Sequence, residues 1–137
     1  MLPVTIVLVE DDPGHARLIE KNIRRAGVSN EITHFTSGTA ALDYLMAHDG
    51  TPTLVLLDLN LPDMNGTKIL EALKSNTATK HIPVIVLTTT DDKTEIQKCY
   101  DLGCNVYITK PVDYDAFATA IRQLGLFLSV MKVPEPT

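Results

Sequence analysis

Side chains that can take part in phosphate chemistry follow directly on short apolar runs of the sequence. Glu10 and Asp11 follow the first run, Asp58 and Thr88 follow two later runs, and Lys110 follows the last. If the runs form one parallel sheet, these side chains meet at the carboxyl ends of its strands, where ligands bind in open sheets. Three carboxylates, a hydroxyl and an ammonium would then share one crevice.

Such a crevice suits the transfer of a phosphoryl group to a carboxylate. Adjacent carboxylates repel one another, and Lys110 is the only cation at a strand end, so a divalent cation would relieve the repulsion. Oxygen ligands without His or Cys suit Mg²⁺. Phosphoryl transfer needs mainly an in-line acceptor and charges around the moving oxygens, and carboxylates can form acyl phosphates. The sequence therefore predicts Mg²⁺-assisted phosphorylation of Asp58.

Each of these residues also has a simpler interpretation when it is taken alone. The acidic pair could be a solvated helix cap, and Asp58 could start the turn at residues 62–66. Thr88 is a common strand residue, and Lys110 could be a surface charge. The functional interpretation is favoured because all of them fall at the carboxyl ends of strands.

The elements that must position these groups alternate between two periodicities. Apolar runs of strand length are Thr5–Val9, Glu31–Phe35, Thr53–Leu57, Val84–Leu87 and Val106–Thr109. Segments of helical period separate and follow them. The alternation predicts an α/β fold with a doubly wound, five-stranded parallel sheet and helices on both faces. We expect a single domain over residues 1–137, with a core at about 4–128 and a C-terminal extension at 125–137.

Local signals mark where individual elements begin and end. Asp12 before Pro13 is a good helix start, because Asp can cap free N–H groups and Pro loses no needed donor there. Gly27 and Gly103 are predicted helix stops in the left-handed conformation. Pro83 is predicted to open the fourth strand, where a missing N–H is tolerated.

Composition narrows the classes of partner and environment. The chain has 137 residues, 45% of them hydrophobic, and a net charge of −5, with Lys and Arg scattered. We therefore expect no nucleic-acid partner. No basic leader or membrane-length apolar stretch is present, so we expect a soluble, cytoplasmic protein without a membrane partner. Cys99 and Cys104 are predicted to be reduced structural thiols.

Four segments together resemble the signature segments of response regulator receiver domains. They are Val9–Asp12, Leu56–Pro62, Val86–Thr89 and Tyr107–Pro111. The likeness covers about Thr5 to Leu128, and the order and separation of the segments match the family pattern. The resemblance implies the (βα)5 flavodoxin-like fold, phosphorylation by a sensor histidine kinase, a Mg²⁺ cofactor, and signalling without enzymatic turnover.

The resemblance also assigns roles around the acceptor. Asp58 would be the phosphoacceptor and Glu10 and Asp11 the acidic pair. Asp11 and Asp58 would ligate Mg²⁺, Glu10 would belong to the same metal site, and Asn60 would add its backbone carbonyl. Thr88 would bond a phosphoryl oxygen.

A second set of implied roles concerns the fifth strand. Lys110 would pair with the phosphoryl group, and its bond to Pro111 would be cis. Tyr107 resembles the switch aromatic, whose ring moves inward when Thr88 is drawn towards the phosphate. Space vacated by the hydroxyl would be filled by the neighbouring ring.

A narrower likeness is to the stand-alone regulators encoded beside bacterial and cyanobacterial phytochrome kinases. It rests on Leu59–Pro62, on Leu87–Thr90 and on a last helix extended to a Pro-containing tail. It suggests a bacteriophytochrome as the kinase. The chain departs from many receivers at Thr89, where Ala or Ser is common. The bulkier side chain could slow the access of phosphodonor or water.

Three alternatives use the same fold differently. An Mg²⁺-dependent phosphatase with an aspartyl nucleophile would carry a second Asp as general acid, but this chain has Asn60, which has no proton to exchange. A flavin module would need a phosphate loop where the acidic residues Glu10–Asp12 stand. A phosphorelay intermediate or a docking-only receiver stays open.

The end of the chain predicts an assembly. The segment 125–133 contains six apolar residues in nine, so a helix there would be apolar nearly all round. An apolar patch left exposed commonly marks an interface. The tail could fold back on its own domain, but we expect a twofold homodimer through the C-terminal helix and tail, as the resemblance to the phytochrome-associated regulators also implies.

Overall fold

Strands and helices alternate along the whole described chain. The computed structural model describes residues 4–47 and 49–128, apart from the side chains of 124–128. The elements are β1 (Thr5–Val9), α1 (Pro13–Arg25), β2 (Ile32–Phe35), α2 (Gly38–Met46), β3 (Thr53–Leu57), α3 (Thr67–Ser75), β4 (Val84–Thr88), α4 (Lys93–Leu102), β5 (Val106–Thr109) and α5 (Tyr114–Leu128). The predicted bounds of β1, β3 and β5 are confirmed. β2 begins one residue later than predicted, and β4 includes Thr88.

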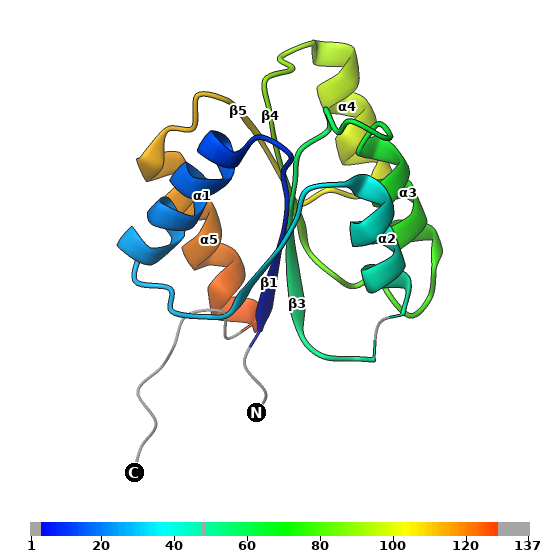
Figure 1. The fold of residues 1–137 in the computed structure, drawn as a ribbon, viewed down its shortest axis with the longest axis horizontal. Helices are drawn as coiled ribbons and strands as arrows, with labels where there is room; N and C mark the ends of the chain where they lie inside the picture. Colours follow the sequence, from blue (N-terminus) through cyan, green and yellow to red (C-terminus); the bar gives the residue numbers. More distant parts are fainter. Residues whose placement is uncertain (1–3, 48, 129–137) are drawn as a thin grey trace.

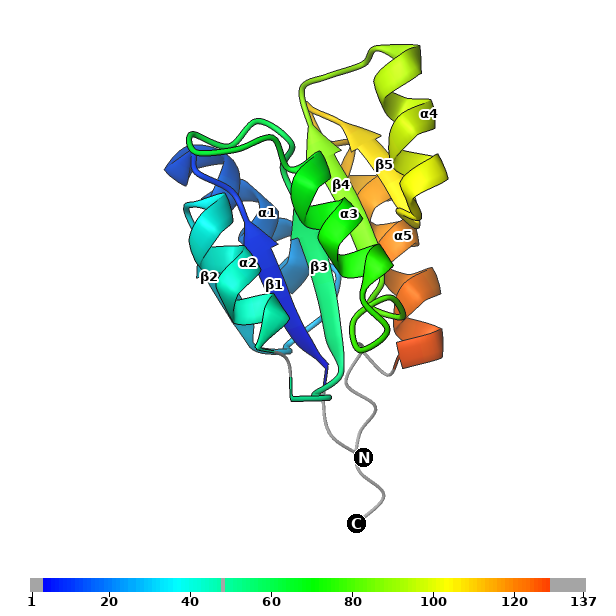
Figure 2. The same cartoon turned by 90° about the vertical axis from the view of Figure 1, so that its right-hand side faces the viewer.

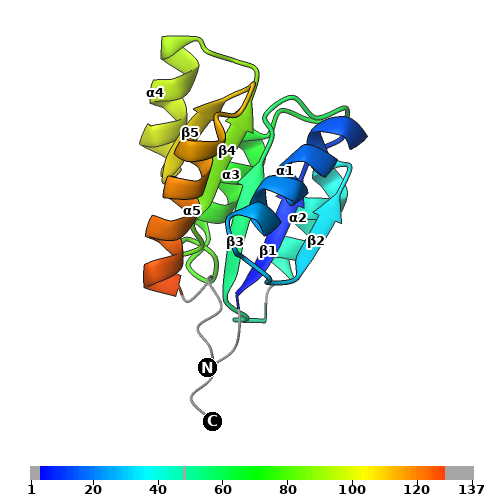
Figure 3. The same cartoon turned by 90° about the vertical axis from the view of Figure 1, so that its left-hand side faces the viewer.

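The strands form one parallel sheet in the order β2-β1-β3-β4-β5. Helices α1 and α5 cover one face, and α2, α3 and α4 cover the other (Figure 1). The two side views show these layers separately, with α3 in front of the sheet in Figure 2 and α1 and α5 in front in Figure 3. The predicted doubly wound α/β fold is confirmed.

Each face of the sheet carries its own apolar core. In β1, Ile6 and Leu8 pack with α1 and α5, whereas Val7 and Val9 pack with the helices of the other face. Successive strand residues point to opposite faces, so a strand buried on both sides must be apolar throughout. The last four residues of β1 and every residue of β3 and β4 are buried, while the edge strands β2 and β5 are mostly half-buried.

The predicted local signals are in place. The Asp12 side chain accepts from the backbone N–H of His15 at 2.9 Å and caps α1. Gly103 ends α4 with φ +109°, and Gly27, just beyond α1, has φ +88°. Pro83 lies directly before β4, and its carbonyl accepts from Val55 in β3.

Some residues differ from the simplest expectation. Four large hydrophobic side chains on the helices are exposed, because each lies off the stripe that faces the sheet: Leu18, Tyr44, Met46 and Tyr100. Cys99 and Cys104 are buried, and burial raises the pKa of the Cys104 thiol to about 12.

Among the described residues, no helix is long and apolar enough to cross a membrane. The predicted tail lies largely at 129–137, outside the described residues.

Candidate phosphorylation and metal site

The predicted site residues lie at or just beyond the carboxyl ends of β1, β3, β4 and β5. These are the upper ends of the strands in Figure 1. Connections from β1 and β3 leave in opposite directions, because β1 leads to β2 on one side of this strand pair and β3 leads to β4 on the other. Open sheets have their crevice at such a point. Glu10 and Asp11 follow β1 and Asp58 follows β3, so the three carboxylates lie beside this crevice.

A buried charged cluster forms the floor of the site. Glu10 is 1% exposed and Asp58 6%, and the Lys110 side chain is 7% exposed. The Lys110 ammonium donates to Glu10 Oε1, and it donates to Asp58 Oδ2 at 3.2 Å. The Lys110–Pro111 peptide bond is cis, as expected. One cation thus sits between two buried carboxylates that would otherwise repel each other.

Burial dominates the ionisation of Glu10. The pKa of this carboxyl is raised, first by desolvation and then by Asp58, although Lys110 and the backbone N–H of Asp12 lower it. The Asp12 N–H donates to Glu10 Oε2 at 3.2 Å. Any further cation brought to the site would favour the ionised form of this carboxyl.

Asp11 completes a possible metal site. Its carboxylate is exposed, and oxygens of Glu10, Asp11 and Asp58 lie within 4.8 Å of one another. It is the one such group found in the described residues. Beside Asp11 lies a shallow groove of about 530 Å³, lined mainly by residues 59–65 of the loop between β3 and α3. An all-oxygen donor set that is open to solvent on one side suits a hard cation that keeps several waters.

Asn60 and two threonines form the next layer. The backbone N–H of Asn60 donates to Asp58 Oδ1 at 3.0 Å. Its side-chain amide donates to the hydroxyls of Thr88 at 3.2 Å and Thr89 at 3.3 Å. Thr88 is fully buried at the end of β4, whereas Thr89 is exposed. The amide of Asn60 therefore holds the Thr88 hydroxyl, which is predicted to bond a phosphoryl oxygen.

Tyr107 lies on the neighbouring edge strand. Its phenol O–H donates to the carbonyl of Thr90 at 2.6 Å, and its backbone N–H donates to the hydroxyl of Tyr100 at 3.1 Å. Burial raises the pKa of the Tyr107 phenol to about 12. The ring is therefore anchored to the connection that follows Thr88. Movement of Thr88 towards the phosphate is predicted to let this ring move inward.

Three residues near the site were not singled out from the sequence. His15 Nδ1 lies 3.1 Å from Lys110 Nζ, and His34 Nε2 lies 2.7 Å from the carbonyl oxygen of Glu10. Asp63, expected only in a turn, accepts from the backbone N–H groups of Gly38 and Thr39. The one available signal was for His15, since the first turn of a helix that follows the acidic pair must lie over the site.

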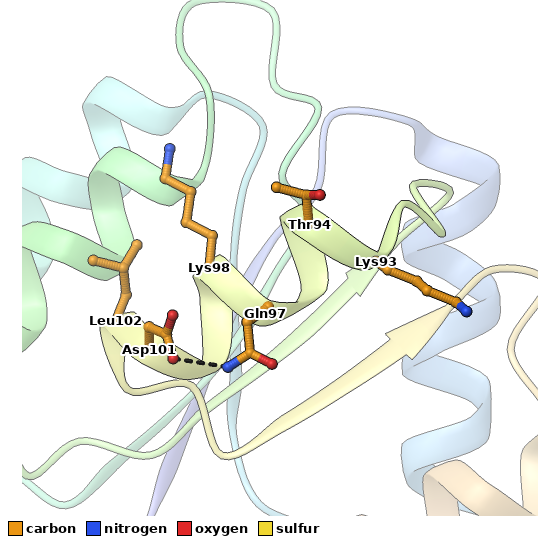
Figure 4. Close-up of a pocket in the computed structure, with 6 residues that line it drawn as sticks. All are labelled: Lys93, Thr94, Gln97, Lys98, Asp101 and Leu102. Atoms are coloured by element: carbon orange, nitrogen blue, oxygen red, sulfur yellow. Dashed lines mark hydrogen bonds between the residues drawn. The ribbon is translucent and has the colours of Figure 1, made fainter.

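A second hollow is lined by side chains of α4 (Figure 4). It has a volume of about 510 Å³ and is lined by Lys93, Thr94, Gln97, Lys98, Asp101 and Leu102. Gln97 donates to Asp101 at 2.8 Å, and the two lysine side chains point in different directions in the figure. Its side chains come from one helix and do not converge, so we place the chemistry at the carboxyl edge.

Comparison with known proteins gives the same assignment. The model of the response regulator receiver domain family matches residues 6–122. The chain belongs to this family. Phosphorylation and Mg²⁺ binding in an acidic pocket are typical of receiver domains, which interact with sensor histidine kinases and are typically not turnover enzymes.

Several relatives are response regulators, and some of these are phytochrome response regulators. A receiver domain from Rhodospirillum rubrum is 67% identical, with a TM-score of 0.79 over 96% of this chain and 97% of that one. The bacteriophytochrome response regulator RtBRR is 38% identical, with a TM-score of 0.83 over 99% and 86%. Response regulator Rcp1 from Synechocystis is 35% identical over 113 residues, which are 79% of this chain and 77% of Rcp1.

Rcp1 has also been solved in a Mn²⁺-bound form. That structure is 31% identical to this chain, with a TM-score of 0.76 over 98% of this chain and 100% of that one. The receiver fold and the likeness to phytochrome-associated regulators, both expected from the sequence, are confirmed.

Proposed function

We propose that Asp58 accepts a phosphoryl group from a histidine kinase and that the carboxyl edge of the sheet is the site of transfer. The observation that carries this is the buried cluster of Asp58, Glu10 and Lys110 next to the exposed carboxylate of Asp11. Asp58 is the carboxylate that leaves a fully buried strand and faces both the cation and the acidic pair. Its rigid support favours one fixed attack geometry.

The donor set fits Mg²⁺. Asp11 and Asp58 would be direct ligands with the backbone carbonyl of Asn60, and Glu10 would complete the acidic set. A bound Mg²⁺ would neutralise the carboxylates and stabilise charge on the phosphoryl oxygens. The open groove beside Asp11 leaves room for the phosphodonor.

The chain's own residues then have distinct tasks. Asp58 supplies the attacking oxygen, and Lys110 keeps an N–H directed at that carboxylate, where phosphoryl charge will develop. Thr88 offers a hydroxyl that the Asn60 amide already holds near the acceptor. Transfer thus depends on positioning and charge more than on proton transfer.

A switch would follow from the same geometry. If the Thr88 hydroxyl turns towards a phosphoryl oxygen, it leaves space on the side of β5. Tyr107 could enter that space once its bond to the Thr90 carbonyl breaks. The changed surface around β5 would be the output signal.

The test is labelling with acetyl phosphate and Mg²⁺, followed by intact-mass measurement. The wild type should gain one phosphoryl group, and Asp58→Asn should gain none. Asp101→Asn, which removes an exposed carboxylate on α4, is the matched control and should label like the wild type. Labelling of Asp58→Asn at the wild-type rate would refute the assignment.

We further propose that the protein is not a turnover enzyme. The position where an aspartyl phosphatase would carry its general acid holds Asn60, and its amide is engaged with Thr88 and Thr89. A steady-state assay with a small phosphate ester should therefore show no sustained release of phosphate. Many turnovers per molecule would contradict this.

The proposed kinase is a bacteriophytochrome, in a cytoplasmic setting. Support comes from the likeness to RtBRR and Rcp1. Phosphotransfer from a purified bacteriophytochrome kinase should be faster than from an unrelated histidine kinase at equal concentration. Equal rates would remove the support for this partner.

A twofold homodimer through the C-terminal helix and tail also remains our proposal. It rests on the apolar sequence of 125–133, of which 129–133 lie outside the described residues. Light scattering of the full chain should show a dimer at ~100 μM, a concentration at which micromolar interfaces are occupied. A monomer at that concentration would exclude the proposal.

A further inference from the structure

The Lys110 ammonium has three acceptors around it. They are Glu10 Oε1, Asp58 Oδ2 at 3.2 Å and, in the tautomer of His15 that carries its proton on Nε2, His15 Nδ1 at 3.1 Å. A lysine ammonium carries three N–H donors and no acceptor. The number of acceptors therefore matches the number of donors, and two of the three acceptors lie away from the reacting carboxylate.

His15 reaches this position from the first turn of α1. Asp12 caps the helix through the backbone N–H of His15, which fixes the start of the chain segment that carries the ring. The side chain is 47% exposed, so the ring lies at the mouth of the site with its Nδ1 turned inwards. His15 Nδ1 is 4.0 Å from Glu10 Oε1, which is too long for a hydrogen bond, so the ring contacts Lys110 instead.

We propose that His15 is a positioning residue for phosphoryl transfer. Together with Glu10 it holds two donors of the Lys110 ammonium, and this directs the third donor at Asp58. His15 touches no reacting atom, so it acts only through the lysine. The inference rests on the proposed role of Asp58 as acceptor.

The transfer step explains why the direction of the third donor matters. A bond forms between an Asp58 oxygen and phosphorus, while the bond from phosphorus to the leaving group of the donor breaks and its electron pair stays with that group. The third N–H of Lys110 then passes from the Asp58 oxygen to a phosphoryl oxygen. No proton is transferred, and the contacts to Glu10 and His15 stay in place.

The experiment compares two variants at this one position. His15→Leu keeps bulk but cannot accept a hydrogen bond, whereas the amide oxygen of His15→Gln can. Phosphorylation by acetyl phosphate at saturating Mg²⁺ should slow by about fivefold to tenfold in His15→Leu, as expected for the loss of one typical hydrogen bond from a half-exposed ring. His15→Gln should recover most of the wild-type rate. Lys21→Leu, exposed on the same helix, is the matched control and should keep the full rate.

Two further measurements separate positioning from a general structural effect. The affinity for Mg²⁺ alone, measured by calorimetry, should change less than about twofold in His15→Leu, because His15 is not a ligand in the proposed metal site. The proton–nitrogen signal of the Lys110 ammonium in NMR spectra should exchange faster with water than in the wild type. If His15→Leu does not fold, His15→Ala takes its place.

The outcomes are distinct. A wild-type rate in the Leu or Ala variant, or a Gln variant as slow as the Leu variant, would overturn the role of His15. A wild-type protein that is not labelled at all would instead overturn the proposed function. A slow Leu variant, a recovered Gln variant and unchanged Mg²⁺ affinity would together establish the positioning role.

Discussion

Asp58 and Asp63 lie on the same connection between β3 and α3, but their carboxylates have different surroundings. Asp58 is buried and bonds the Lys110 ammonium and one backbone N–H. Asp63 is exposed and bonds the backbone N–H groups of Gly38 and Thr39 at 2.9 and 2.8 Å, together with the Thr39 hydroxyl at 2.5 Å. The Thr39 hydroxyl and these N–H groups lower the pKa of Asp63 to about 2.

The contrast separates a carboxylate whose partners are fixed in place from one whose partner is a flexible side chain. The donors to Asp63 come mainly from the N-terminus of α2, which cannot move without the helix, so Asp63 anchors the loop. The cation at Asp58 is on a flexible side chain, which can pass to a new anion without unfolding anything. The same loop therefore has a rigid anchor and a reactive end.

The largest effect should come from removing the cation at the reactive end. Lys110→Met leaves the buried carboxylates of Glu10 and Asp58 without their ammonium, which should lower the free energy of unfolding by about 3 kcal/mol without Mg²⁺. Added Mg²⁺ should restore part of the loss. Urea unfolding with and without Mg²⁺ measures both, and Lys93→Met on α4 is the exposed control. An unchanged free energy of unfolding would mean that the lysine does not stabilise the cluster.

The backbone between the two carboxylates can be tested with glycines that touch the same loop. A Cβ at Gly66 would lie 2.4 Å from the backbone oxygen of Asp58, whereas a Cβ at Gly38 would meet the flexible side chain of Met64. Gly66→Ala should cost about 2 kcal/mol of unfolding free energy and slow phosphorylation, because the acceptor itself must shift. Gly38→Ala should cost less, since Met64 can rotate. Equal losses in the two variants would argue against this difference.

The stabilising effect of Asp63 should depend on pH in the acid range. The folded pKa of Asp63 is about 2 against a usual 3.8, so its stabilising effect is complete above about pH 4 and is lost as the pH falls towards 2. The thermal midpoint of Asp63→Asn should lie below that of the wild type at pH 7, and the gap should close between pH 4 and pH 2. A gap that stays constant over that range would contradict the assignment.

The smallest effect should come from the phenol of Tyr107 on β5. Tyr107→Phe removes the hydrogen bond to the Thr90 carbonyl and should cost about 1 kcal/mol. The folded pKa of about 12 exceeds the usual 10, so this stabilisation is present below pH 10 and is lost between pH 10 and pH 12. Absorbance titration should show a late-ionising tyrosine that is missing in the variant. Identical titration curves for the wild type and Tyr107→Phe would exclude a raised pKa at Tyr107.

Features that depend on local pattern were predictable from the sequence. A strand buried on both faces needs a continuous apolar run, and this gave the bounds of β1 and β3. Thr88 was placed just after β4, but it pairs with Thr109 and so belongs to the strand. The meeting of the acidic pair, Asp58 and Lys110 followed from topology alone, because parallel strands end at one edge.

Contacts that depend on the path of a loop or on the rotation of a helix were not predictable. The ties of Asp63 to α2 and of His34 to Glu10 join segments far apart in the chain, and no local pattern encodes them. Apolar spacing predicted a helix between Asp12 and Gly27, but Leu18 lies outside its buried stripe. The exact rotation of a helix against the sheet comes from packing, which a single sequence does not display.

The decrease in burial from the centre of the sheet to β5 has a consequence for local opening. Backbone amides of β3 and β4 are enclosed on both sides, so their hydrogen exchange should require the largest opening reactions of the fold. β5 has a neighbour on one side only and is half-buried, so smaller fluctuations can expose it. Tyr107 and Lys110 can therefore rearrange through a sub-global opening while the strand that carries Asp58 stays closed. We therefore expect slow amide exchange in β3 and faster exchange in β5.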